Sequence, residues 1–388
     1  MKILHIITRL DRGGSAEDLI QNCIYLHNKG YINKIVCGRN INPTYLLSEL
    51  KSKNIPLINI SCLNRNINLF FDLFAFLKIL KLLFKEKPNI IHTRTSKAGI
   101  IGRWSAWLYK ILFNKNVKII HSTHGHVFYG YYNLFLSYLF ILSEKITAYI
   151  TDKIIVLTEN EITECLKYGI GNKKKFQVIH SGVQYDIKLS GVSLRDQLNI
   201  KSDTLIIGSA GRLEPVKGYD FFIESAKILK DKYPDINIKY LIIGDGSQKE
   251  FLENKVKKYN LKNKFIFTGW KDNVLDYISV VDIYVQPSMN EGFGKTVILA
   301  QLLGKPVIAT YVQGFISIIQ NMKTGILVSS KNPLELAESI KYLIDNKNLR
   351  EKLVFNAKKY VLEKNIQTNF YKFSTEYMNY LLEKLYTC

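Results

Sequence analysis

The sequence predicts an α/β protein made of two parallel-sheet domains. Its 388 residues exceed what one ordinary hydrophobic core holds. Short β-branched runs alternate with longer helical patterns, and this alternation restarts once near the middle of the chain. Such alternation is typical of parallel sheets covered by helices on both faces.

The apolar runs of the first half are separated mostly by helix-length patterns, such as the one that ends at Gly30. These runs predict strands at residues 2–8, 33–38, 56–60, 89–93, 117–123, 153–158 and 176–182. The second half repeats the design, with strands predicted at residues 204–211, 238–246, 264–269, 281–288, 305–310 and 325–328. From about residue 332 onward the pattern is helical.

A polar segment, poor in strand pattern, separates the halves at residues 182–203. We therefore expect an N-terminal domain over 1–188 and a C-terminal domain over 189–369. We expect a last helix, about 370–388, to pack back on the first domain.

The net charge of +21 indicates an anionic partner, although an abundance of Lys, Asn and Ile leaves compositional drift as an alternative. The five cysteines are scattered, with no C-x-x-C pair and no zinc spacing, which favours a reducing compartment. The first residues contain too short an apolar run for a signal peptide, and no uncharged run is long enough to span a bilayer. We expect a cytoplasmic protein.

Loops at the carboxyl ends of parallel strands are the expected ligand sites. The loop after the first strand contains Gly13 and Gly14, which allow a close approach to phosphate, although it lacks the dinucleotide-binding glycine spacing. In the second half, Arg212 and Lys217 follow a strand, and the two cations suit a diphosphate. The alternative for the glycine loop is a plain turn. The alternative for the two cations is a solvated surface.

Two further loops could form walls for a nucleotide base. One is the G-D-G segment from Gly244 to Gly246, and the other is the F-T-G-W segment that ends at Trp270. Each is a weak signal alone.

Glu291 lies in a glycine-containing turn between a predicted strand and a predicted helix. Exposed amides at such a helix start attract anions, and the carboxylate can accept hydrogen bonds from hydroxyl groups. This combination suits a sugar attached to a diphosphate. His124 and His126 follow another strand, where they have either a functional or a structural hydrogen-bonding role.

Taken together, these segments resemble the family-4 glycosyltransferases, retaining enzymes with the two-domain GT-B fold. The resemblance covers nearly the whole chain. It is carried, besides the Gly13–Gly14 loop, by HTRTSKAGIIGR (92–103), STHGHVF (122–128), SGV (181–183), GRLEPVKG (211–218), GDG (244–246), PSMNEGFG (287–294) and GKPVIAT (304–310).

The resemblance implies two Rossmann-like domains facing a cleft, and catalytic roles for His124 and Glu291; His126 is less clearly placed. It implies that the donor diphosphate is bound by Arg212, Lys217, Gly294 and Lys295. It implies contacts to the donor sugar or nucleotide from Gly244, Asp245, Gly246, Thr268, Gly269, Trp270, Gly292 and Phe293. Gly13 and Gly14 would lie near the donor phosphates and the acceptor. No metal or other cofactor is expected, in agreement with the absence of an Asp-x-Asp motif.

One position departs from the family pattern. The second glutamate of the loop, eight residues after Glu291, is replaced by Leu299. In the family this residue receives hydrogen bonds from the nucleotide ribose, and leucine cannot accept them. The loss would weaken donor binding by roughly ten- to a hundredfold.

The predicted acceptor is a glycan, with a lipid-linked one favoured by two apolar, aromatic-rich stretches at 69–87 and 127–145. The first 187 residues carry about two basic groups for each acidic one. Basic, aromatic-rich helices suit an anionic membrane surface, here the inner face of the cell membrane; simple packing on the sheet is the alternative.

The predicted function is a hexosyl- or N-acetylhexosaminyl-type transfer from a nucleotide sugar, with UDP favoured, in surface polysaccharide biosynthesis such as that of capsule or lipopolysaccharide. A catalytically impaired relative that binds a partner is the alternative, and a GT-B sugar-nucleotide epimerase is a remote one. Nucleic-acid binding is disfavoured because the sequence contains no recognition motif.

Overall fold

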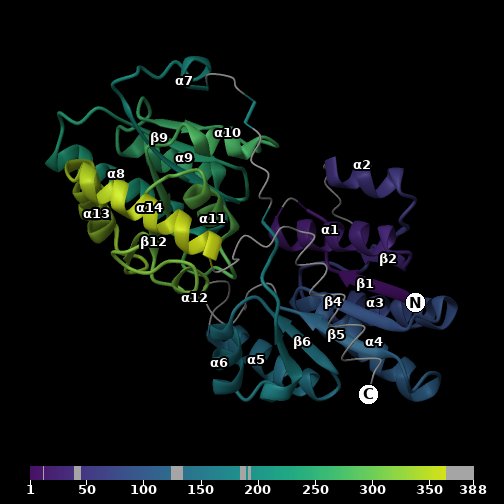
Figure 1. Ribbon diagram of the computed structural model, residues 1–388. Helices are drawn as coiled ribbons and strands as arrows, with labels where there is room; N and C mark the ends of the chain where they lie inside the picture. Colours follow the sequence, from purple (N-terminus) through teal and green to yellow (C-terminus); the bar gives the residue numbers. More distant parts are fainter. Residues whose placement is uncertain (12, 39–44, 124–133, 184–188, 191–193, 364–388) are drawn as a thin grey trace. The chain divides into compact units, whose positions relative to one another are not determined.

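The protein is described by a computed structural model over residues 1–11, 13–38, 45–123, 134–183, 189–190 and 194–363 (Figure 1). It divides into two compact units, with the change from the first to the second between Gly182 and Val183. The predicted boundary at 188/189 and the predicted last helix at 370–388 adjoin or fall in segments outside the described residues.

The first unit contains a seven-stranded sheet in the order β3-β2-β1-β4-β5-β6-β7, in which every neighbouring pair is parallel. The strands are β1 (Lys2–Ile7), β2 (Ile32–Cys37), β3 (Leu57–Asn59), β4 (Ile90–Arg94), β5 (Lys118–Ser122), β6 (Lys153–Val156) and β7 (Phe176–Val178).

Helices cover both faces of this sheet. They are α1 (Gly14–Asn28), α2 (Tyr45–Ser52), α3 (Leu69–Glu86), α4 (Ser96–Leu112), α5 (Leu134–Tyr149) and α6 (Glu159–Lys167), with a short 3-10 turn η1 (Lys173–Lys175). The strand order moves outward from β1 in both directions. Because parallel crossovers are right-handed, α1 and α2 cover one face and α3 to α6 cover the other.

Alternate side chains of β1 contribute to the hydrophobic core on the two faces of the sheet. Leu4 and Ile6 pack with the buried residues of α3 and α4, such as Ile79. Ile7 packs on the opposite face with α1 residues such as Leu19. Side chains of a strand point alternately to its two faces, so a strand buried on both faces is mostly apolar, as β1 is apart from Lys2 and the buried His5.

The second unit contains a six-stranded sheet in the order β10-β9-β8-β11-β12-β13, again parallel throughout. The strands are β8 (Leu205–Ala210), β9 (Ile238–Ile243), β10 (Phe265–Phe267), β11 (Ile283–Gln286), β12 (Val307–Thr310) and β13 (Ile326–Val328). The helical segments are α7 (Leu194–Gln197), η2 (Pro215–Lys217), α8 (Tyr219–Lys232), α9 (Lys249–Lys258), α10 (Val274–Ser279), α11 (Lys295–Leu302), α12 (Gln313–Ile316), α13 (Pro333–Asp345) and α14 (Lys347–Glu363).

Every strand predicted from the sequence is present, and all of them pair in parallel, so the predicted fold class is confirmed. Most of the predicted runs extend beyond the strands at their carboxyl ends, where the chain leaves the sheet as a loop. Within the described residues, no helix has both the length and the apolar character needed to cross a bilayer.

Candidate functional site

The predicted donor-binding residues gather at one edge of the second sheet. They follow β8, β9, β10 and β11, and these strands are neighbours in the sheet. The chain runs outward from β8 to β9 and β10 in one direction, and from β11 onward in the other. The edge between β8 and β11 is therefore a topological switch point, where parallel α/β sheets bind ligands.

An ion pair joins the two loops that flank this switch point. Lys217 ends η2, after β8, and Glu291 lies in the loop after β11. The Lys217 Nζ atom is 2.6 Å from Glu291 Oε2, and both side chains are largely shielded from solvent. The structure thus brings the lysine predicted to bind the diphosphate into direct contact with the glutamate predicted to bind the sugar.

A chain of buried polar groups leads from β11 to Glu291. The Tyr284 hydroxyl donates to Gln286 Oε1 at 2.9 Å, and Gln286 Nε2 donates to Ser288 Oγ at 3.2 Å. Ser288 Oγ in turn donates to Glu291 Oε2 at 3.4 Å. Thr310 on β12 also donates to the Ser288 carbonyl group. These contacts restrict the position of the carboxylate.

This supporting chain of hydrogen bonds was not predicted from the sequence. Its signal was present, because Gln286 and Ser288 are polar residues at the end of an otherwise apolar strand. A buried polar group needs a hydrogen-bond partner, so such residues at a strand end mark a prepared site.

Backbone contacts brace the same two loops. The Met289 amide donates to the Val216 carbonyl at 2.7 Å. Gly218 has φ of +67°, and a Cβ atom there would lie 2.1 Å from the Pro287 carbonyl oxygen. Only glycine fits such an approach in this conformation. The spacing between Lys217 and Glu291 is therefore set by the backbone as well as by their charges.

The loops after β8 and β9 meet in the same manner. The Leu213 amide donates to the Asp245 carbonyl at 2.9 Å. Gly244 has φ of +144°, and a Cβ atom there would lie 2.0 Å from the Gly211 carbonyl oxygen. Gly244 also forms an isolated bridge with Gly269, which brings the loop that contains Thr268 and the exposed Trp270 beside them.

The start of α11 completes the edge. Gly294 is its N-cap, with φ of +76°, and Gly292 lies two residues before it. The Phe293 side chain is buried, so a contact from this residue to a ligand would come from its backbone. Lys295 and Leu299 are both partly exposed on α11.

Arg212 is also partly exposed, on the loop directly after β8. With Lys217 and Lys295, it gives three cations to the loops and the helix start that follow β8 and β11.

The remaining predicted residues belong to the first unit. Gly13 and Gly14 begin α1, where the Gly13 carbonyl accepts hydrogen bonds from the amides of Ala16 and Glu17. His124 and His126 lie outside the described residues, so their predicted roles stay predictions. Thr95, before α4, has φ of +64°, which is an outlier for a β-branched residue and marks a constrained segment at this sheet edge.

The buried carboxyl of Glu161 is bound by Thr123, the residue that precedes His124 in the sequence. The Thr123 hydroxyl donates to Glu161 Oε2 at 3.0 Å, and the Leu157 amide donates to the same atom at 3.1 Å. Burial raises the pKa of Glu161 to about 7, and the two hydrogen bonds oppose this shift only partly.

Glu161→Gln should remove a pH dependence of stability. A carboxyl with a raised pKa stabilises the fold fully below its unfolded value of 4.5, and this contribution is lost as pH rises through about 7. We expect the wild type to lose roughly 2–3 kcal/mol relative to the variant between pH 5 and pH 8. Denaturant unfolding at several pH values measures this difference. Parallel pH curves would contradict it, and Glu250→Gln, an exposed carboxyl on α9, is the control.

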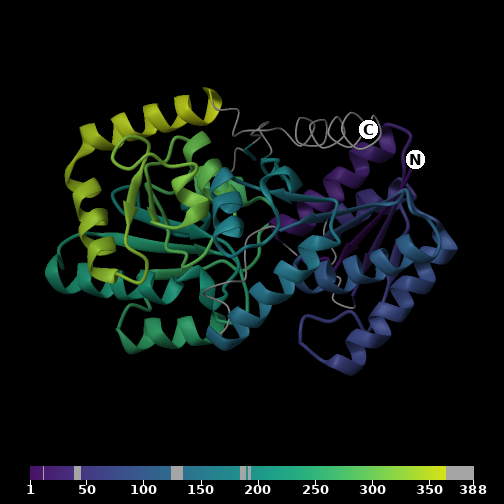
Figure 2. The same cartoon turned by 90° about the horizontal axis from the view of Figure 1, so that it is seen from below.

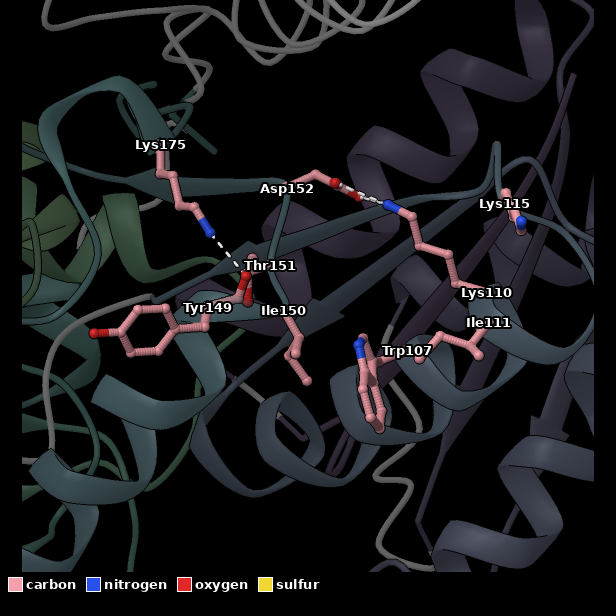
Figure 3. Close-up of a pocket in the computed structure, with 9 residues that line it drawn as sticks. All are labelled: Trp107, Lys110, Ile111, Lys115, Tyr149, Ile150, Thr151, Asp152 and Lys175. Atoms are coloured by element: carbon pink, nitrogen blue, oxygen red, sulfur yellow. Dashed lines mark hydrogen bonds and ion pairs between the residues drawn. The ribbon is translucent and has the colours of Figure 1, made fainter.

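A separate hollow in the first unit is lined by none of the predicted site residues (Figure 3). It has a volume of about 530 Å³ and lies between the carboxyl ends of α4 and α5. Lys110 Nζ lies 2.9 Å from both carboxylate oxygens of Asp152, and Lys175 donates to the carbonyls of Ala148 and Tyr149. Burial lowers the pKa of Lys175. These cations are already paired with protein groups, so the hollow is not the candidate site.

No group of three or more His, Cys, Asp or Glu side chains in the described ranges is arranged to hold a metal ion. Independence of a metal remains a prediction.

Family models match both halves of the chain. The model described as "Glycosyltransferase Family 4" matches residues 13–186, and the model "Glycosyl transferases group 1" matches residues 193–360. The two matches adjoin at the polar segment that separates the sheets.

Relatives of known name support the same assignment. The chain is 27% identical to the Escherichia coli UDP-Gal:alpha-D-GlcNAc-diphosphoundecaprenol alpha-1,3-galactosyltransferase, over 91% of this chain and 92% of that protein. It is 28% identical to the capsular polysaccharide biosynthesis glycosyltransferase CapM of Staphylococcus aureus, over 81% and 83%.

Among solved structures, Anabaena Alr3699/HepE in complex with UDP and glucose matches with a TM-score of 0.79, at 18% identity, over 99% of this chain and 100% of that one. At this identity the likeness concerns the fold, which is that of GT-B enzymes. The architecture, the two matched domain models and the relatives agree with one another. The chain therefore belongs to the family-4 glycosyltransferases, with a Glycosyl transferases group 1 domain as its second half.

Proposed function

We propose that this glycosyltransferase moves a hexosyl or N-acetylhexosaminyl group from a UDP-sugar to a lipid-linked glycan during the synthesis of a bacterial surface polysaccharide. The observation that carries the proposal is the Lys217–Glu291 pair at 2.6 Å, held between two glycine-braced loops at a switch point. A cation for a diphosphate and a carboxylate for sugar hydroxyls are the two groups that such a donor requires.

In this proposal the cations replace a metal ion. Negative charge builds on the diphosphate as it leaves the sugar, and Arg212 and Lys217 stabilise that charge. The first amides of α11, after Gly294, add a positive helix end. Glu291 accepts hydrogen bonds from the sugar. The donor thus separates Lys217 from Glu291 and gives each a new partner.

The names of relatives support the donor and the acceptor. The Escherichia coli relative is named for UDP-Gal and for a diphosphoundecaprenol-linked GlcNAc, which is a lipid-linked sugar. Membership of the family supports transfer with retention of configuration. The same acceptor class supports a cytoplasmic protein that works at the inner face of the cell membrane.

A panel of UDP-, GDP- and ADP-sugars tests the donor. We expect release of UDP, or slow hydrolysis, with one or more UDP-sugars, and saturation-transfer signals from the same compounds. No binding of any nucleotide sugar would refute the proposal. A lipid-linked acceptor should then raise the rate of UDP release well above that of hydrolysis.

A catalytically impaired relative is the second candidate, and Leu299 is the observation that favours it. The side chain is partly exposed on α11, eight residues after Glu291, and offers no acceptor to a ribose. An impaired relative should bind UDP weakly or not at all in calorimetry.

Leu299→Glu should tighten UDP binding by roughly tenfold, because a carboxylate there regains charge-assisted hydrogen bonds to the ribose. Isothermal titration calorimetry of both proteins measures the change. Leu299→Gln separates charge from hydrogen bonding and should give a smaller gain. Unchanged affinity in Leu299→Glu would show that another group already holds the ribose, or that the ribose lies elsewhere.

A further inference from the structure

The outward faces of α3 and α5 leave large apolar side chains in solvent. On α3 these include Phe70, Leu73, Phe74 and Leu77. The opposite side of the same helix, with Ala75, Ile79 and Leu83, packs on the sheet. An ordinary surface helix presents polar residues outward, whereas the first turns of α3 are apolar on the outward side as well.

Helix α5 repeats the arrangement. Five of its exposed apolar residues are spaced by three or four along one stripe, and they are Phe135, Tyr138, Leu142, Ile146 and Tyr149. Helix α4 contacts both α3 and α5, and these helices cover one face of the first sheet (blue to teal in Figure 2). We call the exposed faces of these two helices the α3/α5 surface. No described residue covers these side chains, and exposed apolar patches of this kind mark interaction sites.

Charge is sorted on the same helices. The acidic groups of α3 and α5 point inward or are paired: Asp72 with Lys97 at 2.7 Å, and Glu144 with Arg103 at 2.6 Å. Glu86 is buried and lies 2.7 Å from Lys34 Nζ, and the hydrogen bond from Lys34 holds its pKa below the usual value. Helix α4 contains no acidic residue.

The exposed charges of these helices are basic. Lys78, Lys81 and Lys85 continue the outward side of α3 beyond its apolar first turns, and Lys145 is exposed on α5. At the carboxyl ends of α4 and α5, Lys115 is exposed at the hollow where Lys110 pairs with Asp152 (Figure 3). The α3/α5 surface is thus apolar and cationic, with no exposed carboxylate on either helix.

We propose that the α3/α5 surface docks on an anionic lipid bilayer, with the phenylalanine and leucine side chains inserted at the headgroup boundary and the lysines against lipid phosphates. Aromatic and leucine side chains beside lysines are the composition that binds this interface. A second copy of the chain fits less well, because two such faces would bring lysines against lysines. The inference does not rest on the proposed transferase activity, because it is measured without donor or acceptor.

Vesicle co-sedimentation of the full chain tests the surface. We expect binding to vesicles of phosphatidylglycerol and phosphatidylcholine, weaker binding to phosphatidylcholine alone, and weaker binding at high salt. Phe70→Glu combined with Phe135→Glu should lower the partition coefficient by at least about tenfold. The matched control is Phe251→Glu with Phe355→Glu in the second unit, where Phe355 is as exposed as Phe135, at 70% each.

A second pair of variants tests the charge. Lys81→Gln with Lys85→Gln on α3 should weaken binding to anionic vesicles by about tenfold and leave binding to neutral ones unchanged. Lys358→Gln with Lys359→Gln on α14 makes the same change in net charge on an exposed helix of the second unit, and should have little effect. Circular dichroism checks that each variant is folded.

Three outcomes would overturn the proposal. One is the absence of wild-type binding to anionic vesicles, and another is equal loss in the variants and their controls. The third is a wild-type dimer in gel filtration that the Phe70 and Phe135 changes convert to a monomer while vesicle binding is absent. Each of these leaves the UDP-sugar assay unaffected, so failure here is distinct from failure of the proposed function.

Discussion

Lys217→Ala should lower kcat/KM for the nucleotide sugar by about 10²–10³-fold. The variant removes a cation placed to stabilise the leaving diphosphate, and removal of one such group costs about this much in other enzymes. It also removes the ion-pair partner of Glu291, because Lys217 Nζ lies 2.6 Å from Glu291 Oε2 in the wild type. Steady-state release of UDP measures the loss, and Arg212→Ala should give a loss of the same order.

The control for this prediction is Lys227→Ala. That lysine pairs with Asp231 on the exposed side of α8, so the variant changes net charge equally without touching the site. A loss of less than about threefold in Lys217→Ala would exclude it from a diphosphate-binding role.

Gly218→Ala should damage both stability and donor binding. A left-handed conformation costs an alanine roughly 1–2 kcal/mol. The new Cβ would also lie 2.1 Å from the Pro287 carbonyl oxygen, so the loops carrying Lys217 and Glu291 must separate. We expect a total loss of roughly 3 kcal/mol or more in unfolding free energy, and strongly weakened UDP binding.

Gly30→Ala separates the two causes. Gly30 has φ of +84°, but a Cβ atom there would meet nothing within 4 Å. It should therefore show the conformational cost alone, on the order of 1–2 kcal/mol. Denaturant unfolding of both variants gives the difference. Equal destabilisation would contradict the claim that close approach, rather than backbone conformation, constrains the site.

The fold could be predicted because each strand has its own local signal. The runs at residues 2–8 and 238–246 are rich in isoleucine and leucine, as strands buried on both faces are. The strand ends were less accurate. Gly244 and Gly246 lie in the predicted run but outside β9, since the chain leaves the sheet at Ile243.

The site could be predicted only as separate loops. Position after a strand identified Arg212, Lys217 and Glu291 as candidates, but a sequence does not state which strands are neighbours. The adjacency of β8 and β11 is a long-range property, and it produces the Lys217–Glu291 contact. Gln286 likewise has a contact from another element, because the Thr296 hydroxyl of α11 donates to Gln286 Oε1 at 3.3 Å.

The environment of the two long apolar stretches also could not be predicted fully from the sequence. The sequence left open whether they pack on the sheet or face a membrane. Helix α3 packs on the sheet with one side, while Phe70 and Leu77 remain exposed on the other. The alternatives are compatible, because a helix that is apolar all round has one face for each environment.

The bracing of the loops by the Met289 amide and by Gly218 has a consequence for the thermodynamics of recognition. Loops that fold only around a ligand lose conformational entropy at the moment of binding, and their affinity is reduced accordingly. Here the loops on both sides of the switch point are ordered when the chain folds. Donor association should therefore proceed with little reorganisation of the main chain around Lys217 and Glu291, and mainly with an exchange of partners by their side chains.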